Sequence, residues 1–228
     1  MSIAQPLQAV LFDLDGTLVD TAPDMAAALN RLRAEHGLDA MPYERLRPYV
    51  SRGSNGLIGV GFGAVPNDAE RAEMIERFLA IYNARLCDES KLFAGMTAAL
   101  DWIEARGIPW GIVTNKPEWL ARPLLTQLSL LARAGCIVSG DSLPERKPHP
   151  RPLLHAAELL RVAPSACVYV GDDLRDVEAG RAAGMGTVVA RWGYVPPDQD
   201  PAEWGADTQI ATPAALLAWL RAQTLAPR

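Results

Sequence analysis

Short hydrophobic runs alternate with longer amphipathic stretches along most of this sequence. The first run, Gln8 to Phe12, ends abruptly at Asp13, which is typical of a buried strand in a parallel sheet. Similar runs predict further strands at 109–114, 136–139, 166–171, 186–190 and near Gln209. Helical patterns lie between these runs, at 96–106, 117–128, 151–161 and 173–183, with a last helix ending near Gln223. Repeated strand–helix units predict an α/β fold in which helices cover both faces of a doubly wound parallel sheet, a Rossmann-like core.

The region between Thr21 and Glu89 differs from the rest because its patterns are helical and no convincing strand occurs in it. Thr21 is expected to cap a helix that begins near Ala22, and a second long helix is expected between Glu70 and Leu86. We expect residues 21–90 to form an inserted, all-helical cap, and residues 1–20 and 91–228 to form the α/β core. The insertion follows the first strand at the edge where such sheets bind ligands, so the cap should close over a bound ligand.

Polar residues follow the expected carboxyl ends of four strands. Asp13 and Asp15 are two residues apart in the string Asp-Leu-Asp-Gly-Thr. A calcium loop counted from Asp13 would need Gly and Glu where Leu18 and Asp24 stand, so that interpretation fails. A solvated turn stays open for this string taken alone. The other three strand ends carry Thr114 with Asn115, Lys147 with Pro148, and the run Gly171-Asp172-Asp173-Leu174-Arg175-Asp176.

Together, and in this order, the four strings resemble the motifs of the haloacid dehalogenase-like phosphatases, and they span nearly the whole chain. The resemblance implies that Asp13 attacks phosphorus and that Asp15 acts as the general acid and base. It implies Mg²⁺ as the cofactor, held by Asp13, the main-chain carbonyl of Asp15, and Asp172. Weaker metal candidates, as outer or water-mediated partners, are Asp173 and Asp176. Phosphate-binding roles are implied for Thr114, Asn115 and Lys147.

Composition narrows the possible partners. The chain has 228 residues, of which 49% are hydrophobic, so it can bury one substantial core with a small accessory domain. Its formal net charge is −5 and its Lys and Arg residues are scattered, which argues against binding nucleic acid. No apolar run is long enough to cross a membrane and no leader pattern opens the chain, so a cytoplasmic location is expected. Three widely spaced cysteines indicate neither a disulfide framework nor a zinc site.

The substrate is expected to be a small phosphorylated metabolite. The chain resembles the phosphoglycolate phosphatase-like group, which carries a helical cap. Four strings, at 90–93, 110–117, 171–176 and 204–207, are similar to phosphatases of bacterial cell-wall recycling that act on N-acetylmuramic acid 6-phosphate. Phosphoglycolate is the alternative substrate, and a phosphosugar mutase that needs a bisphosphate activator is a less favoured alternative. A binding module without activity should lack a key acid or Lys147, and all of these are present.

The sequence of the expected cap identifies few residues that could recognise a sugar. Arg52, Gly53 and Ser54 are candidate substrate contacts, with an ordinary polar loop as the alternative. The glycine-rich stretch from Gly59 to Gly63 lacks the spacing and the preceding strand of a nucleotide site, so we interpret it as a flexible turn. The oligomeric state is left open by the sequence.

Overall fold

The computed structural model describes residues 7–63 and 67–224, and its centre is a six-stranded sheet in which every paired strand is parallel. The strand order is β5-β4-β1-β6-β7-β8. The strands are β1 (Ala9–Phe12), β4 (Trp110–Val113), β5 (Cys136–Val138), β6 (Cys167–Gly171), β7 (Gly186–Ala190) and β8 (Thr208–Ile210). The expected doubly wound sheet is therefore confirmed, and β1, which ends at the predicted acids, lies between two neighbours that protect both its edges.

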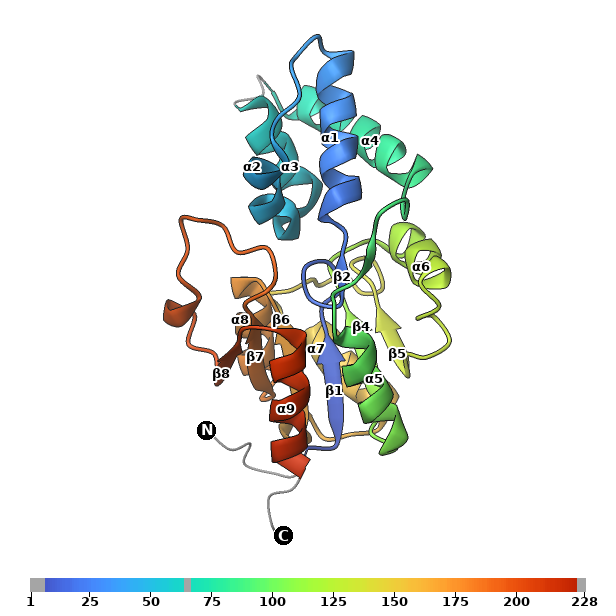
Figure 1. The fold of residues 1–228 in the computed structure, drawn as a ribbon, viewed down its shortest axis with the longest axis vertical. Coiled ribbons are helices and arrows are strands. Elements are labelled where there is room, and N and C mark those ends of the chain that lie inside the picture. The colour runs from blue at the N-terminus through green and yellow to red at the C-terminus, as the bar shows by residue number, and fades with distance from the viewer. Residues whose placement is uncertain (1–6, 64–66, 225–228) are drawn as a thin grey trace.

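Helices cover both faces of the sheet, as the alternation of side chains along β1 requires. Val10 and Phe12 belong to one hydrophobic cluster, and Ala9 and Leu11 belong to another. The helices α5 (Met96–Ala105), α6 (Glu118–Gln127) and α9 (Pro213–Thr224) contribute to the first cluster. The helices α7 (Arg151–Leu160) and α8 (Leu174–Ala182) contribute to the second. Figure 1 shows α5 and α9 in front of the sheet and α7 and α8 behind it.

A helical unit lies beyond the carboxyl end of β1 (Figure 1). It consists of α1 (Ala22–Glu35), α2 (Tyr43–Leu46), the 3₁₀ helix η1 (Arg47–Arg52), α3 (Gly53–Phe62) and α4 (Asp68–Ala84). Leu29 of α1 and Phe78 of α4 are fully buried, in the same hydrophobic cluster that covers one face of the sheet. The helical unit is therefore packed together with the sheet domain through a shared apolar cluster.

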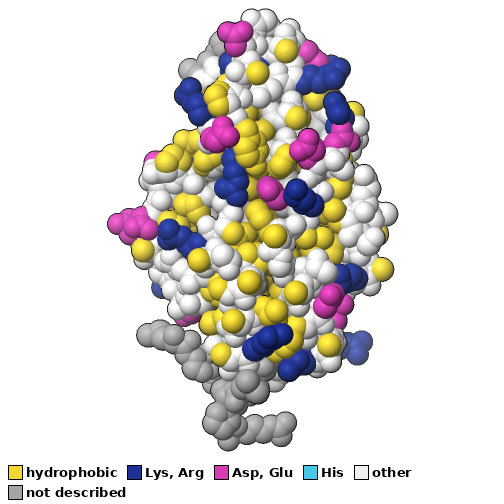
Figure 2. Space-filling view, viewed as in Figure 1, with side chains coloured by type: hydrophobic (Ala, Val, Ile, Leu, Met, Phe, Trp, Pro, Cys, Tyr) yellow, Lys and Arg dark blue, Asp and Glu magenta, His cyan; other side chains and the backbone are white. Residues whose placement is uncertain are grey.

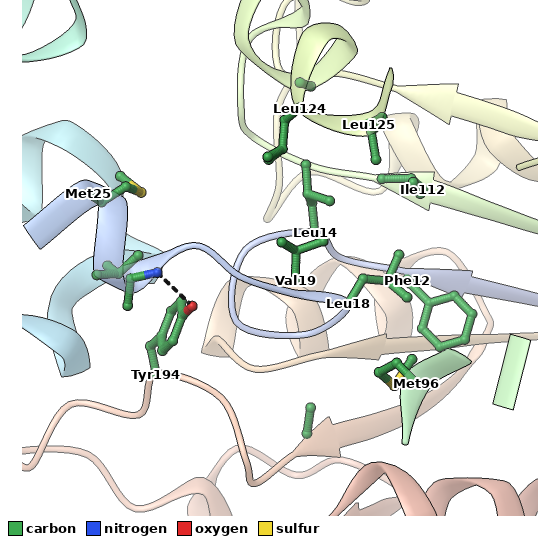
Figure 3. Packing of buried hydrophobic residues seen from close by; sticks show 14 of the residues in the cluster. Phe12, Leu14, Leu18, Val19, Met25, Met96, Ile112, Leu124, Leu125 and Tyr194 are labelled. Carbon is green, nitrogen blue, oxygen red and sulfur yellow. Dashed lines mark hydrogen bonds between the residues drawn. The ribbon is translucent and has the colours of Figure 1, made fainter. Parts of the chain in front are cut away.

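Two chain segments connect the helical unit to the sheet, and they pair with each other. The strands β2 (Val19–Asp20) and β3 (Lys91–Leu92) form an antiparallel pair that the sequence patterns did not predict. Tyr194 lies beside this connection, where its hydroxyl group accepts a hydrogen bond from the backbone N–H of Ala22 at 3.0 Å (Figure 3). The same hydroxyl donates to Asp20 at 2.7 Å. Tyr194 thus fixes the point at which α1 leaves the core.

Two local expectations were wrong, and the structure excludes one alternative that the sequence left open. Thr21 precedes α1, but its hydroxyl group makes no capping bond and instead donates to Asp15. The stretch from Gly59 to Gly63 is not a turn, because all but its last residue belong to α3. Arg52 to Asn55 is not a loop either, since it joins the end of η1 to the first turn of α3. Glycine content lowers helix propensity, but the packing of Leu57 and Ile58 in the core outweighs it.

The remaining expectations from the sequence concern the cysteines, membrane-spanning helices and the charge of the surface. Cys87, Cys136 and Cys167 are all free. In the part of the chain that the structure describes, no helix combines the length and the hydrophobicity needed to cross a membrane. Figure 2 shows acidic and basic side chains interspersed on the visible face, so that face carries no uniform charge.

Candidate functional site

A cavity of about 590 Å³ lies between the carboxyl ends of the strands and the helical unit. Most of the residues predicted from the sequence line it: Asp13, Asp15, Thr114, Asn115, Lys147, Asp173 and Asp176 from the core, and Arg52, Gly53 and Ser54 from the helical unit. Asp172 is fully buried, yet its carboxylate lies within 4.8 Å of those of Asp13 and Asp176. The structure therefore brings the predicted residues together around one cavity of ligand size.

Local geometry explains why the first acids are followed by glycine. Gly16 has a φ of +86°, a conformation that other residues adopt only with strain. A Cβ atom at this position would collide with the carboxylate of Asp172. The absence of a side chain lets the turn after β1 approach the loop after β6 closely, and this approach brings Asp13 and Asp172 together.

Lys147 joins two of the acids. Its Nζ atom lies 2.8 Å from Asp13 and 2.8 Å from Asp176, and it donates to the Tyr169 hydroxyl at 2.7 Å. Burial raises the pKa of Asp13 to about 7, although Lys147 acts in the opposite direction. Burial tends to lower the pKa of Lys147, but the two carboxylates outweigh it and the pKa rises. The lysine is thus held as a cation beside Asp13.

Asp172 accepts three hydrogen bonds that orient both its oxygens. Thr17 donates to Oδ1 at 2.9 Å, while the Ser51 hydroxyl and the backbone N–H of Tyr194 donate to Oδ2 at 2.7 and 2.8 Å. Burial, followed by the negative charges of Asp13 and Asp176, raises the pKa of Asp172 well above its usual range. A buried carboxylate in this position favours either a proton or a cation beside it.

The other two acids of this run have different partners. Asp173 is the N-cap of α8 and forms a capping box with Asp176. Arg175 pairs with Asp173 at 2.7 Å, and these bonds outweigh burial, so that the pKa of Asp173 is lowered. Oδ2 of Asp176 accepts from the backbone N–H groups of Asp172 and Asp173, and its Oδ1 faces Lys147. Among these described carboxylates, Asp172 accepts only from neutral donors, whereas Asp13 and Asp176 contact Lys147 and Asp173 contacts Arg175. The oxygens of Asp13, Asp172 and Asp176 lie close enough together to fit a hard divalent cation.

Asp15 has partners that sequence reasoning did not identify. Its Oδ1 atom accepts from the Thr21 hydroxyl at 2.6 Å and from Lys116 at 2.9 Å. Lys116 also donates to the hydroxyl of Tyr82, which belongs to α4. The position of Lys116, directly after the strand-end residues Thr114 and Asn115, was the available signal. Its contact with Asp15 joins residues far apart in the sequence and could not be derived from spacing.

Thr114 and Asn115 shape the two lysine-bearing loops. The Asn115 amide donates to the backbone carbonyl of Lys147 at 3.0 Å and accepts from its N–H at 3.1 Å. The Thr114 hydroxyl accepts from the backbone N–H of Lys116 at 3.1 Å. Asn115 thus fixes the loop that carries Lys147, and Thr114 fixes the turn that carries Lys116.

The helical unit reaches this centre through η1 and the start of α3. Arg52 lines the cavity, and its side chain is 35% exposed with Asp198 at 3.5 Å, a long contact. Ser51, which sequence reasoning missed, contacts the acidic cluster directly, and its carbonyl accepts from Arg175 at 2.7 Å. Arg47 donates to the backbone carbonyls of Trp192 and Gly193. These bonds hold the helical unit against the core.

The fold and the site define a class of protein: a doubly wound α/β core whose carboxylates and buried lysine meet at the carboxyl ends of parallel strands, beneath a helical unit. Residues 10–190 match the family of haloacid dehalogenase-like hydrolases. Because this match covers most of the sequence, the chain belongs to that family, and the resemblance seen in its motifs is confirmed.

Known relatives support a more specific class. A phosphoglycolate phosphatase of Xanthomonas campestris is 48% identical over 92% of this chain and 94% of its own. An N-acetylmuramic acid 6-phosphate phosphatase of Pseudomonas aeruginosa is 40% identical over 92% of this chain and 93% of its own. A solved structure, described as a predicted phosphoglycolate phosphatase of Haemophilus somnus, is 26% identical, with a TM-score of 0.82 over 95% of this chain and 99% of that one. The chain is therefore a phosphoric monoester hydrolase.

Proposed function

We propose that this phosphatase removes the phosphate of N-acetylmuramic acid 6-phosphate, with Mg²⁺ as its cofactor. The observation that carries the substrate proposal is the cavity of about 590 Å³ between the acids and the helical unit, which suits a sugar better than a two-carbon acid. Relatives of that activity at 40% and 41% identity support it.

In the proposed reaction, an oxygen of Asp13 attacks phosphorus while the bond between phosphorus and the sugar oxygen breaks. Asp15 gives its proton to the departing oxygen. Water then attacks the phosphorus of the aspartyl phosphate, and Asp15 takes a proton from that water as the bond to Asp13 breaks. Inorganic phosphate and the free sugar are the products. The common cavity of Asp13 and Asp15 supports this division of roles.

The metal would be held by Asp13, Asp172 and the main-chain carbonyl of Asp15, with Asp173 and Asp176 as outer partners. Burial raises the pKa values of Asp13 and Asp172 because it disfavours their ionised forms. A divalent cation bound there would stabilise those ionised forms by its positive charge. The residues of the chain supply the rest of the charge. Lys147, beside Asp13, would stabilise negative charge on the transferring group, and the Thr114 hydroxyl would donate to it.

We propose that Asn115 acts mainly by positioning Lys147, because its side-chain amide forms hydrogen bonds with both the backbone carbonyl and the backbone N–H of that residue. We further propose that residues 21–90 act as a cap over a core of residues 1–20 and 91–228. Arg52, Gly53 and Ser54 would contact the sugar from the cap side, and the Arg52 guanidinium suits the lactyl carboxylate of the substrate.

Phosphoglycolate is the second candidate, because the relatives at 48% identity bear that name. The two substrates differ in what they offer the cap. The amino sugar has many polar groups remote from phosphorus, and binding energy from them can raise kcat/KM.

The test measures kcat/KM for phosphate release from three esters: N-acetylmuramic acid 6-phosphate, N-acetylglucosamine 6-phosphate and phosphoglycolate. We expect the first to be preferred over the second by roughly 10-fold or more, because donors left unpaired without the lactyl group cost about 1–3 kcal/mol each. Equal rates on both sugars, or a preference for phosphoglycolate, would overturn the substrate and leave the phosphatase class intact.

A further inference from the structure

Lys116 is a second buried lysine of the cavity, and its contacts differ from those of Lys147. Its side chain is only 5% exposed, and its Nζ atom lies 2.9 Å from Oδ1 of Asp15. The same atom donates to the Tyr82 hydroxyl at 3.1 Å and lies 4.7 Å from the centre of the Tyr82 ring. Lys116 therefore joins an acid of the core to helix α4 of the helical unit.

Burial tends to lower the pKa of Lys116, but the Asp15 carboxylate and then Tyr82 outweigh it, so the lysine remains a cation. Burial also raises the pKa of Tyr82 to about 12, which keeps its hydroxyl group neutral. A buried ion pair of this kind contributes little net stability, because desolvation of both charges opposes their attraction. Its place at the cavity wall is better explained by an effect on the reaction.

The hydrogen bonds of Asp15 are unequal on its two oxygens. Thr21 and Lys116 both donate to Oδ1. Within residues 7–63 and 67–224, no hydrogen bond reaches Oδ2. One oxygen is thus anchored from two sides, and the other is left to carry a proton to or from a ligand in the cavity.

We propose that Lys116 is a positioning residue that acts through Asp15, and that Tyr82 makes this positioning depend on the helical unit lying against the core. The inference rests on the proposed acid–base role of Asp15. It gives the two lysines separate roles, because the Nζ atom of Lys147 contacts Asp13 and Asp176, whereas the Nζ atom of Lys116 contacts Asp15 and Tyr82.

The test compares two leaving groups. The sugar of N-acetylmuramic acid 6-phosphate leaves as a basic alkoxide that needs a proton, whereas p-nitrophenyl phosphate releases a stabilised phenolate that needs almost none. Because kcat/KM reports the steps up to alcohol release, it isolates proton donation by Asp15. We expect Lys116→Met to lower kcat/KM about 10- to 100-fold for the sugar ester and less than about 3-fold for the nitrophenyl ester.

Three further variants complete the test. Tyr82→Phe keeps the ring and removes only the hydroxyl group, so it should show the same selective loss at about 3- to 10-fold, and it keeps the proposal testable if Lys116→Met folds poorly. Lys91→Met, which removes an exposed lysine outside the cavity, should leave both rates unchanged. Adding Lys116→Met to Asp15→Asn should cost almost nothing more, since both changes act on the same proton transfer.

Equal losses on both esters in Lys116→Met and Tyr82→Phe would overturn the inference, because a structural or phosphate-binding role affects both substrates alike. Asp15→Asn separates this failure from that of the proposed function. A selective loss in Asp15→Asn with equal losses in the other two variants refutes only the role of Lys116. An equal loss in Asp15→Asn itself refutes the acid–base role of Asp15 and the inference with it.

Discussion

The hydroxyl group of Ser51 donates a hydrogen bond to Oδ2 of Asp172 at 2.7 Å, and this bond connects the helical unit to the buried acids. The backbone carbonyl of Ser51 accepts from Arg175, so the same residue is held twice by the loop and helix that follow β6. In this structure the helical unit is thus closed over the cavity and tied to the residue proposed as a metal ligand. Ser51 therefore links the position of the helical unit to the hydrogen bonding of Asp172.

The first prediction concerns that bond. Ser51→Ala should lower the free energy of unfolding by about 1–2 kcal/mol, because Asp172 loses one of its three donors while remaining buried. Urea denaturation followed by circular dichroism measures this loss. Ser54→Ala is the matched control, because Ser54 lines the same cavity and its hydroxyl group bonds to none of the described residues. It should change stability by less than about 0.5 kcal/mol. Equal losses of stability in the two variants would contradict a stabilising role for the hydrogen bond between Ser51 and Asp172.

The second prediction concerns the lysine between Asp13 and Asp176. Lys147→Met should destabilise the fold by about 3–5 kcal/mol near neutral pH, because it leaves two buried carboxylates without their cation. The loss should shrink in mild acid, where Asp13, whose pKa burial raises to about 7, takes up a proton. Urea denaturation at both pH values measures the difference, and Lys91→Met serves as the exposed control. A small loss of stability at neutral pH would contradict the stabilising role of Lys147 between Asp13 and Asp176.

The third prediction concerns metal and pH. Folding raises the pKa of Asp13 from 3.8 to about 7, with burial as the main cause. Between these values the folded protein keeps a proton that the unfolded chain has released, so this group makes the metal-free protein less stable as pH rises through that window. A bound cation must displace the same proton. Calorimetric titration should therefore give tighter Mg²⁺ binding at pH 8 than at pH 6, with proton release at the lower pH.

Affinity that is independent of pH would contradict this linkage. Full phosphatase activity in excess EDTA would contradict the metal requirement itself. Calcium should replace Mg²⁺ poorly, because its larger and looser coordination shell does not favour the compact geometry of in-line attack.

The sequence predicted the sheet well because the relevant signals are local. The central strands are short apolar runs that stop at a polar residue, as β1 does when Phe12 is followed by Asp13. Because parallel strands end at one edge, the boundaries after β1, β4 and β6 predicted that Asp13, Thr114 and Asp172 would gather. Lys147 lies in the loop between β5 and α7, and its place in the site was implied by the family resemblance.

The rest of the site depends on contacts that no local pattern encodes. Thr21 has the residue type and position of a helix cap, yet its hydroxyl group bonds to Asp15 because the turn after β1 folds back toward it. Lys116 reaches Tyr82, and Ser51 reaches Asp172, only when the helical unit packs on the core. Glycines predicted a turn at Gly59 to Gly63, but tertiary packing of the neighbouring apolar residues made a helix of it.

Asp13 is the attacking group of the proposed mechanism, and Asp13→Asn tests this role most directly. The amide is almost the same size as the carboxylate, so the fold should persist, and melting temperature together with circular dichroism provides the check. An amide cannot form the acyl phosphate. The measurement is the rate of phosphate release from N-acetylmuramic acid 6-phosphate and p-nitrophenyl phosphate by the folded variant. We predict no turnover above background on either ester, and near-normal turnover on either would contradict the proposed mechanism.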